Sequence, residues 1–431
     1  MPRTLQRCLA ATLCLLLQGA AMATDHAGGR NFPQGSGGIN AAHQVDKPYL
    51  VLVSLDGFRW DLQDRHPTPA LDRITAEGVR AERLIPVFPT LTFPNHYSIA
   101  TGLYPARHGL VANEFPDSDR RKWYALRDRQ AVGDGRWYGG EPVWVAAETQ
   151  GMVAAAFFFV GTEAAIGGVR PTHWRGYEKS TPGTDRVDQV LAWLAEPPST
   201  RPHLYMLYFE DVDDHSHWSG PGSAEGAAAV QRVDGYLDRL LQGIDALPHG
   251  GMVNLVIVSD HGQTAHLADA EPLVLDQHVA LDGVTVIEGG SYAWLYFDQP
   301  EPARAAAFRD VINGAWRNGR AWLPEEAPPS WAVTASGRYP DVIVQPDPGH
   351  GVISVPEKSY KITAGDHGWA PEADAMHGIF MARGPAIRPG AGLGPVRVVD
   401  VYPLLLHLLD LEPPANLDGD PDALRSILVN D

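Results

Sequence analysis

Cysteine is almost absent from this chain. Two cysteines occur in 431 residues, Cys8 and Cys14, and both lie near the start of the sequence. The rest of the chain therefore has no disulfide bond and no thiolate ligand, which excludes disulfide-rich scaffolds and cysteine-based zinc sites. Any metal site beyond residue 14 must use carboxylate, imidazole or hydroxyl groups.

Long apolar runs and an excess of positive charge are also missing. After the first 23 residues, no segment approaches the roughly 18 consecutive apolar residues that a membrane-spanning helix needs. The formal net charge is -18, with 34 Lys and Arg against 52 Asp and Glu. An acidic surface argues against a nucleic-acid polymer as the main ligand, because neutralisation of phosphates holds such complexes together. Small anions remain possible ligands, because bound dications reverse the local sign of charge.

The N-terminus has the pattern of an export signal. Positive charges precede the apolar run 8–17, and a small-x-small sequence ends at Ala23. This pattern predicts a signal peptide over residues 1–23, cleaved near Ala23, and a protein that is periplasmic or secreted. Residues 24–45 are rich in Gly, Asn and Gln and are expected to form a flexible arm.

From Tyr49 onward, apolar strand-like runs alternate with amphipathic stretches. Strands are predicted over residues 50–55, 152–159, 203–209, 255–258, 284–288, 293–297 and 342–344, and helices over 69–78, 184–194, 224–247, 302–318 and 399–411. This order predicts an α/β fold whose mostly parallel central sheet is flanked by helices on both faces. Residues 46–431 are expected to form a single catalytic domain, in which residues 288–355 form a small inserted cap.

Carboxylate and imidazole side chains follow several of these strands. Asp56 follows the first strand, Asp213 and His217 follow the strand at 203–209, and Asp260 with His261 follow the strand at 255–258. Because the carboxyl ends of parallel strands share one edge of the sheet, these groups are expected to converge there. Oxygen and nitrogen ligands of this kind suit a two-metal site.

Each of these residues also has a simpler interpretation. A lone Asp after a strand is most often a turn former or a helix cap, which is the alternative for Asp56. His215 competes with His217 as a ligand. The i,i+4 spacing from Asp213 favours His217, because residues four apart lie on the same side of a helix.

A hydroxyl group lies in a suitable loop. Thr92 follows Phe88-Pro89-Thr90-Leu91 and precedes a stretch that looks like the start of a helix. A threonine at a helix N-terminus meets free backbone N–H groups and the positive end of the helix dipole, which stabilise an anion or an alkoxide. Thr92 is therefore the candidate nucleophile.

Together, these motifs resemble one family. The segment from Thr92 to Asn113, with the motifs around Asp56, Asp213, Asp260 and the Gly365-Asp366-His367-Gly368 loop, is similar to the nucleotide pyrophosphatase/phosphodiesterase family of the alkaline phosphatase superfamily. The similarity extends from about residue 48 to residue 420, so it implies an alkaline phosphatase-like fold. It also implies two zinc ions, held by the following residues: Asp56, Asp260, His261 and Thr92 for one, and Asp213, His217 and His367 for the other.

The resemblance further implies a mechanism and a substrate. Two dications stabilise the attacking and the departing oxygen of a displacement at phosphorus, and coordination activates an otherwise poor nucleophile such as Thr92. A phosphothreonine would form and then be hydrolysed, while Asn113 donates to a phosphoryl oxygen. Phe93 and Tyr177 resemble the aromatic pair that stacks on a nucleobase, which implies small nucleotides cleaved to nucleoside 5'-monophosphates. Phe93 as an ordinary core residue is the alternative.

Other functions remain open at this stage. A sibling hydrolase of the superfamily would act on phosphonates, phosphomonoesters or lipid-headgroup phosphodiesters, and a secreted metal or nucleotide binder would have lost catalysis. A sulfatase is disfavoured, because its nucleophile derives from cysteine or serine. Leu91, Gln263 and Trp369 depart from the family pattern, which puts the substrate preference in doubt. The sequence leaves the oligomeric state open, and the ligand set would also accept manganese or cobalt.

Overall fold

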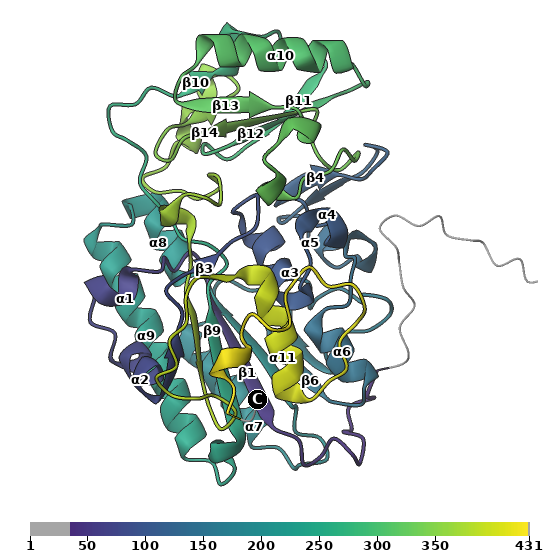
Figure 1. The fold of residues 1–431 in the computed structure, drawn as a ribbon, viewed down its shortest axis with the longest axis vertical. Helices are drawn as coiled ribbons and strands as arrows, with labels where there is room; N and C mark the ends of the chain where they lie inside the picture. Colours follow the sequence, from purple (N-terminus) through teal and green to yellow (C-terminus); the bar gives the residue numbers. More distant parts are fainter. Residues whose placement is uncertain (1–34, 430–431) are drawn as a thin grey trace, which may run out of the picture.

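The computed structural model describes residues 35–429, so the predicted signal peptide 1–23 lies outside the described residues (Figure 1). A seven-stranded sheet forms the centre of the molecule. Its strands, in spatial order, are β2 (Gly78–Arg80), β16 (Phe380–Arg383), β9 (Val253–Val258), β1 (Tyr49–Leu55), β8 (Leu204–Phe209), β6 (Ala154–Phe157) and β7 (His173–Arg175). β16 runs antiparallel to both of its neighbours, and the other neighbouring strands pair in parallel. The predicted mostly parallel sheet is confirmed.

The central strands are apolar on both faces because helices cover both faces. In β1, Leu50 and Leu52 belong to one buried core, while Val51 and Val53 belong to the other. Three helices pack on the first face: α3 (Thr92–Thr101), α6 (Val143–Thr149) and α11 (Val401–Leu409). The second face is covered by α2 (Pro69–Glu77), α7 (Gly183–Leu194), α8 (Asp211–Ser219) and α9 (Ala224–Asp245). This two-sided burial explains the near-continuous apolar runs in the sequence.

A second sheet stands above the body in Figure 1, at the end that carries β4 and α8. It contains β11 (Val284–Glu288), β12 (Ala293–Phe297), β14 (Val342–Pro346) and β13 (Gly319–Trp322), covered by α10 (Pro302–Ala315). Leu295, Phe308 and Ile312 belong to a core of its own. The Arg120 guanidinium binds the Asp341 carboxylate at 2.6 Å and so ties this sheet to the body.

Shorter elements complete the described chain. They are α1 (Leu62–Arg65), β3 (Leu84–Ile85), α4 (Pro105–His108), β4 (Glu114–Pro116), β5 (Trp123–Ala125), α5 (Arg129–Val132), β10 (Leu273–Val274), β15 (Val352–Ile353) and β17 (Val396–Arg397). Within residues 35–429, none of the helices combines the length and the apolar character that a membrane crossing requires.

The described part of the predicted flexible arm 24–45 is anchored rather than loose. Asn40 is 5% exposed, and its side-chain amide donates to the carbonyl oxygens of Pro198 at 3.0 Å and Arg201 at 2.7 Å. Gln44 is also buried and donates to the Gln150 carbonyl at 2.8 Å. The polar composition of this segment therefore reflects hydrogen bonds to the body as well as exposure to solvent.

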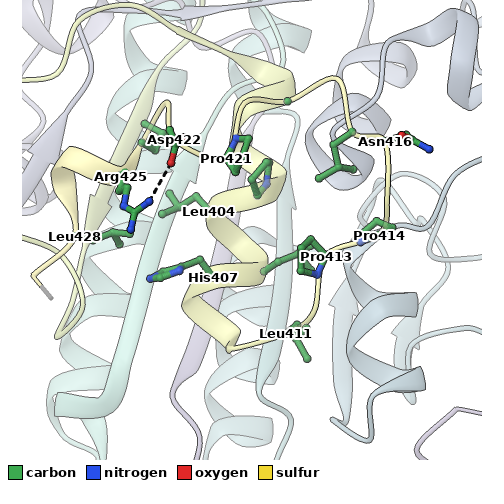
Figure 2. Close-up of a pocket in the computed structure, with 15 residues that line it drawn as sticks. Leu404, His407, Leu411, Pro413, Pro414, Asn416, Pro421, Asp422, Arg425 and Leu428 are labelled. Carbon is green, nitrogen blue, oxygen red and sulfur yellow. Dashed lines mark hydrogen bonds and ion pairs between the residues drawn. The ribbon is translucent and has the colours of Figure 1, made fainter. Parts of the chain in front are cut away.

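Helix α11 and the segment after it enclose a hollow of about 560 Å³ (Figure 2). Leu404, His407, Leu411 and Leu428 line it together with several prolines. None of the residues predicted to form the active site lines this hollow.

Candidate active site

Three neighbouring strands deliver the predicted ligands to one edge of the sheet. In the order β9–β1–β8, Asp260 and His261 follow β9, Asp56 follows β1, and Asp213 lies in the first turn of α8, just beyond β8. Gly57 allows the sharp exit from β1, because its φ is +66° and a Cβ there would lie 2.6 Å from Nε2 of Gln263. The parallel arrangement therefore brings together residues that are far apart in sequence.

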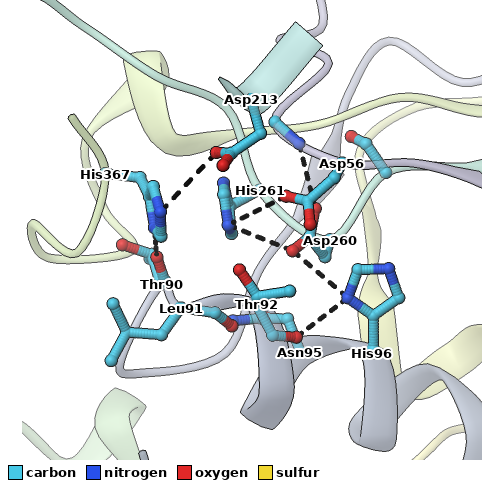
Figure 3. Close-up of polar contacts among 12 residues, drawn as sticks. Asp56, Thr90, Leu91, Thr92, Asn95, His96, Asp213, Asp260, His261 and His367 are labelled. Carbon is cyan, nitrogen blue, oxygen red and sulfur yellow. Dashed lines mark hydrogen bonds and ion pairs between the residues drawn. The ribbon is translucent and has the colours of Figure 1, made fainter. Parts of the chain in front are cut away.

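One group of ligand-type atoms surrounds His261 (Figure 3). Its Nε2 lies 3.0 Å from Oδ2 of Asp260 and 3.6 Å from Oδ1 of Asp56. All three side chains are buried. Thr92 is the first residue of α3, and Figure 3 shows its hydroxyl directed towards His261 and Asp260. The structure thus brings the first predicted set of four residues together.

A second group surrounds Asp213. Its Oδ2 lies 3.5 Å from Nε2 of His217, one turn further along α8, and its Oδ1 lies 3.6 Å from Nε2 of His367. The rings of His367 and His261 stack with centroids 3.7 Å apart, so the two groups adjoin. His215 instead uses Nδ1 in a 2.8 Å hydrogen bond to the Asp211 carbonyl and lies beside Arg232.

The first group fits a bound cation. Oδ1 of Asp56, Oδ2 of Asp260 and Nε2 of His261 are buried, and none of them makes a hydrogen bond with good geometry among the described residues, although Nε2 of His261 lies 3.0 Å from Oδ2 of Asp260. Buried polar atoms normally have a partner, and unpartnered carboxylate oxygens are costly. Burial and the carboxylates of Asp260 and Asp213 raise the pKa of Asp56 well above its usual range. A dication at this point would satisfy all three atoms and favour the ionised form.

The electrostatic surroundings of Asp260 and His367 also favour metal binding. Burial favours the neutral form of Asp260, but His261 and His96 outweigh it and hold the pKa of that carboxyl well below its usual range. Burial, together with the charges of His261 and His217, lowers the pKa of His367 well below its usual value. His367 is therefore neutral at physiological pH, which is the form that binds a metal. Its Nδ1 makes a 2.8 Å hydrogen bond with the Thr90 carbonyl, which leaves Nε2 for coordination.

Two further residues near the site, His96 and Asp366, already make hydrogen bonds to other groups. His96 lies 3.3 Å from Asp260, but its Nδ1 bonds the Thr92 carbonyl at 2.9 Å and its Nε2 bonds the Ser54 hydroxyl at 2.8 Å. The Oδ1 of Asp366 accepts the His367 backbone N–H at 2.8 Å, and its Oδ2 lies 3.3 Å from His266. His96 and Asp366 therefore lie next to the predicted ligands and are not counted among them.

Asn113 is positioned by the first turn of α3. Its Oδ1 accepts the backbone N–H of Phe93 at 3.0 Å, which leaves its amide N–H groups as donors. The backbone N–H of Thr92 is at the first helical position and has no acceptor within the helix. Donors from Asn113 and Thr92 thus lie at the same helix end, where an anionic oxygen is stabilised.

Tyr208 is a functional neighbour that the sequence analysis missed. It lies near the end of β8, and its hydroxyl donates to Oδ2 of Asp56 at 2.6 Å. Burial, and then the charge of Asp56, raises the pKa of Tyr208 well above 10, so the hydroxyl stays a donor. Gln263 likewise donates to Oδ1 of Asp213. A tyrosine within an apolar strand gave no signal for this role.

Replacing Tyr208 with phenylalanine tests this contact. The variant keeps the ring and loses the hydrogen bond that orients Asp56, so its affinity for zinc, used as the probe metal, is expected to fall about tenfold to 100-fold. Competition with a chromogenic chelator measures that affinity. Tyr205→Phe is the matched control on the same strand, because the buried Tyr205 hydroxyl has no hydrogen-bond partner among the described residues. Equal zinc affinities for the two variants would contradict the assigned role of Tyr208.

A cavity of about 620 Å³ opens onto this site. Its lining includes the following predicted residues: Asp56, Thr92, Phe93, Asn113, Tyr177, Asp213, His217 and His367. Asp260 and His261 lie buried beside it: Nε2 of His261 is 3.6 Å from Oδ1 of Asp56, and Oδ1 of Asp260 accepts the backbone N–H of Gly57 at 3.2 Å. Phe93 packs edge-on against Tyr124, and Tyr177 packs edge-on against Phe158. Both rings therefore border the cavity that contains the candidate nucleophile.

The chain is similar to known proteins over most of its length. Residues 50–370 match the model of the family described as type I phosphodiesterase / nucleotide pyrophosphatase. The chain belongs to this family. The match spans β1 to the His367 loop, so it includes every strand end that contributes a ligand-type side chain.

Individual relatives are about 30% identical to the chain over the aligned residues. Human ectonucleotide pyrophosphatase/phosphodiesterase family member 5 is 32% identical over 369 residues, which cover 85% of this chain and 76% of the relative. Human family member 1 is 30% identical over 393 residues, which cover 89% of this chain and 42% of the relative. Family member 1 is thus much longer than the segment that it shares with this chain.

A solved structure has the same fold. An inactive threonine-to-alanine variant of the mouse family member 5, in complex with AMP, superposes with a TM-score of 0.82. It is 30% identical, and the match covers 89% of this chain and all of that structure. This similarity confirms the α/β fold predicted from the sequence.

Proposed function

We propose that this family member hydrolyses phosphodiester and pyrophosphate bonds of small nucleotides and releases nucleoside 5'-monophosphates. One observation carries the proposal: buried carboxylates and imidazoles converge beside Thr92 at a cavity bordered by Phe93 and Tyr177. The AMP bound to the mouse relative is consistent with a nucleotide ligand.

Two zinc ions are the proposed cofactors. Asp56, Asp260, His261 and Thr92 would hold one, and Asp213, His217 and His367 would hold the other. When bound, such a pair supplies positive charge that stabilises the oxygens of a displacement at phosphorus and lowers the pKa of a coordinated hydroxyl. The three buried atoms without partners, on Asp56, Asp260 and His261, support this assignment.

The chain itself would carry out a double displacement. Thr92 Oγ gives its proton to water and forms a bond to phosphorus, while the bond from phosphorus to the leaving oxygen breaks and that oxygen departs with the electron pair. Water then attacks the phosphothreonine, breaks the Oγ–P bond and releases the nucleoside monophosphate. Asn113 and the Thr92 N–H would donate to the phosphoryl oxygens as their negative charge grows. Phe93 and Tyr177 would hold the base.

The proposed domain organisation follows the same assignment. Residues 1–23 would be a signal peptide, so that the mature protein acts in the periplasm or outside the cell. Residues 46–431 would form the catalytic domain. The sheet from Val284 to Pro346 would be its cap, which begins somewhat before the expected boundary of 288–355.

A substrate panel tests the proposed function. We expect the purified protein to hydrolyse a nucleotide p-nitrophenyl ester with a lower KM than bis-p-nitrophenyl phosphate, because only the first offers a base to stack. Tyr177→Ala should raise the KM for the nucleotide ester by about tenfold, since stacking contributes about 1–3 kcal/mol per base. Steady-state kinetics measures both. A preference for a choline phosphodiester would instead assign the protein to the lipid-headgroup hydrolases.

A further inference from the structure

Tyr177 lies on a segment that regular structure does not hold in place. The segment connects β7, which ends at Arg175, with α7, which begins at Gly183. Tyr177 is 37% exposed, and its neighbours from residue 175 to residue 180 are also exposed. A stacking platform must keep a defined orientation to contribute affinity, because ordering a free side chain on binding costs entropy. The contacts that fix this segment therefore matter for recognition.

Glu163 provides such a contact. Its Oε1 accepts the backbone N–H of Tyr177 at 3.2 Å, and its Oε2 accepts a hydrogen bond from Nη2 of Arg129. The Glu163 side chain is 17% exposed and lines the same cavity as Tyr177. A carboxylate can accept at both oxygens at once, whereas an amide accepts only at one.

Arg129 links Glu163 to the part of the chain that contacts Asn113. It is the first residue of α5, which begins shortly after β5. Between these elements, the backbone N–H of Leu126 donates to the Asn113 carbonyl at 3.0 Å. Leu126, Arg129, Glu163 and Tyr177 all line the cavity. The chain from Leu126 to Arg129 thus links the contact at Asn113 to the contact of Glu163 with Tyr177.

Contacts with other aromatic rings also hold the side chain of Tyr177. The Tyr177 ring meets the ring of Phe158 at 5.3 Å and that of Tyr208 at 6.3 Å, both edge-on. Lys179 and Asp214 form a 2.7 Å ion pair that ties the same segment to α8. The rings limit the tilt of Tyr177, and the ion pair holds the segment further along. Glu163 fixes the backbone at Tyr177 itself.

We propose that Glu163, held by Arg129, is a positioning residue that sets the orientation of Tyr177 and thereby the affinity for the nucleobase. This inference rests on the proposed function, because it assumes that Tyr177 stacks on a base. Glu163 takes no part in the chemistry at Thr92. Its effect should therefore appear in KM for substrates that carry a base.

An electrostatic role and a positioning role of the Arg129–Glu163 pair predict different changes in KM for two variants. Glu163→Gln removes a negative charge from the cavity, whereas Arg129→Gln removes a positive one. If the pair acted through its electrostatic effect on an anionic substrate, the two variants would shift KM in opposite directions. If the pair positions Tyr177, both variants raise KM.

The experiment compares two substrates that share a leaving group: a nucleotide p-nitrophenyl ester and methyl p-nitrophenyl phosphate, which has no base. For the nucleotide ester, both variants should raise KM about three- to tenfold, a part of the total stacking contribution, with kcat unchanged. For the methyl ester, KM should stay at the wild-type value. Arg121→Gln is the control, because this exposed arginine lies between β4 and β5, close in sequence to Arg129, and does not line the cavity.

A double-mutant cycle provides the decisive measurement. In a Tyr177→Ala background, Glu163→Gln should cause no further rise in KM, because its effect operates through Tyr177. Additive effects, opposite signs for the two single variants, or an equal change for the methyl ester would each overturn the inference. Failure of the proposed function would look different: the wild-type protein itself would show no preference for the ester that carries a base.

Discussion

Replacing Thr92 with alanine will lower the turnover of a nucleotide substrate by about 10³-fold or more, the order expected for loss of a nucleophile. The hydroxyl of Thr92 points towards His261 and Asp260 from the first turn of α3 (Figure 3). The Tyr208 hydroxyl also lies at this cavity, but it already donates to Asp56. Loss of the Thr92 hydroxyl therefore removes the proposed covalent step.

The same variant is expected to keep its metals. Six other side chains would hold the two ions, and none of their mutual contacts passes through the Thr92 hydroxyl. Metal content, measured by mass spectrometry on the purified variant, should match that of the wild-type protein. A secreted binder without catalytic activity would show no difference between Thr92→Ala and wild type in any of these measurements.

Two controls make the result specific. Thr92→Ser retains a hydroxyl at the same position and should retain a large part of the turnover. Thr101→Ala alters the last turn of the same helix, where the Thr101 hydroxyl donates to the Tyr97 carbonyl at 2.7 Å, and should leave turnover close to wild type. If Thr92→Ala hydrolyses substrate at the wild-type rate, the proposed nucleophile is wrong.

Removal of the metal ions will abolish activity and also destabilise the fold. Without a cation, the buried carboxylates of Asp56 and Asp260 face each other with oxygens that lack partners. A ligand present at 100 times its dissociation constant adds about 2.7 kcal/mol to the free energy of unfolding. With an unfolding entropy of about 2.1 cal/mol/K per residue, the loss of one such ion should lower Tm by about 3 °C, so chelation of both proposed ions should lower it by about 6 °C.

Calorimetry with and without a zinc-selective chelator measures this effect, and added zinc should restore both Tm and activity. Asp56→Asn provides the matched variant, because it keeps the side-chain shape and removes one buried negative charge. It should bind less zinc, yet its melting temperature should fall less when the chelator is added. An unchanged Tm for the wild-type protein after complete metal removal would contradict the assignment of a metal to these buried groups.

The sequence predicted the parts of this molecule that depend on the periodicity of apolar residues and on the order of motifs along the chain. Apolar runs followed by Asp56, Asp213 and Asp260 indicated parallel strands that end at one edge, and the structure has β1, β8 and β9 side by side. The i,i+4 spacing of Asp213 and His217 likewise survives as one turn of α8. These features are local in sequence, so a pattern reveals them.

Features that depend on tertiary contact were not predictable. Tyr208 looks like any aromatic strand residue until the fold places its hydroxyl against Asp56. The short strand β16 was missed because its four residues carry no alternating pattern and gain their place by pairing with β9. Glu163 acquires its contacts only when the segment of Tyr177 folds back over the cavity.

The spacing of the ligand-type residues along the chain has a consequence for how the protein matures. Asp56 and His367 stand near opposite ends of the described chain, yet they border one cavity. Closing loops of that length is slow, and it comes late compared with local pairing. Binding of an ion by Asp213, His217 and His367 would therefore require the chain to be folded as far as His367, and fragments ending before His367 are expected to be inactive even with Thr92 present.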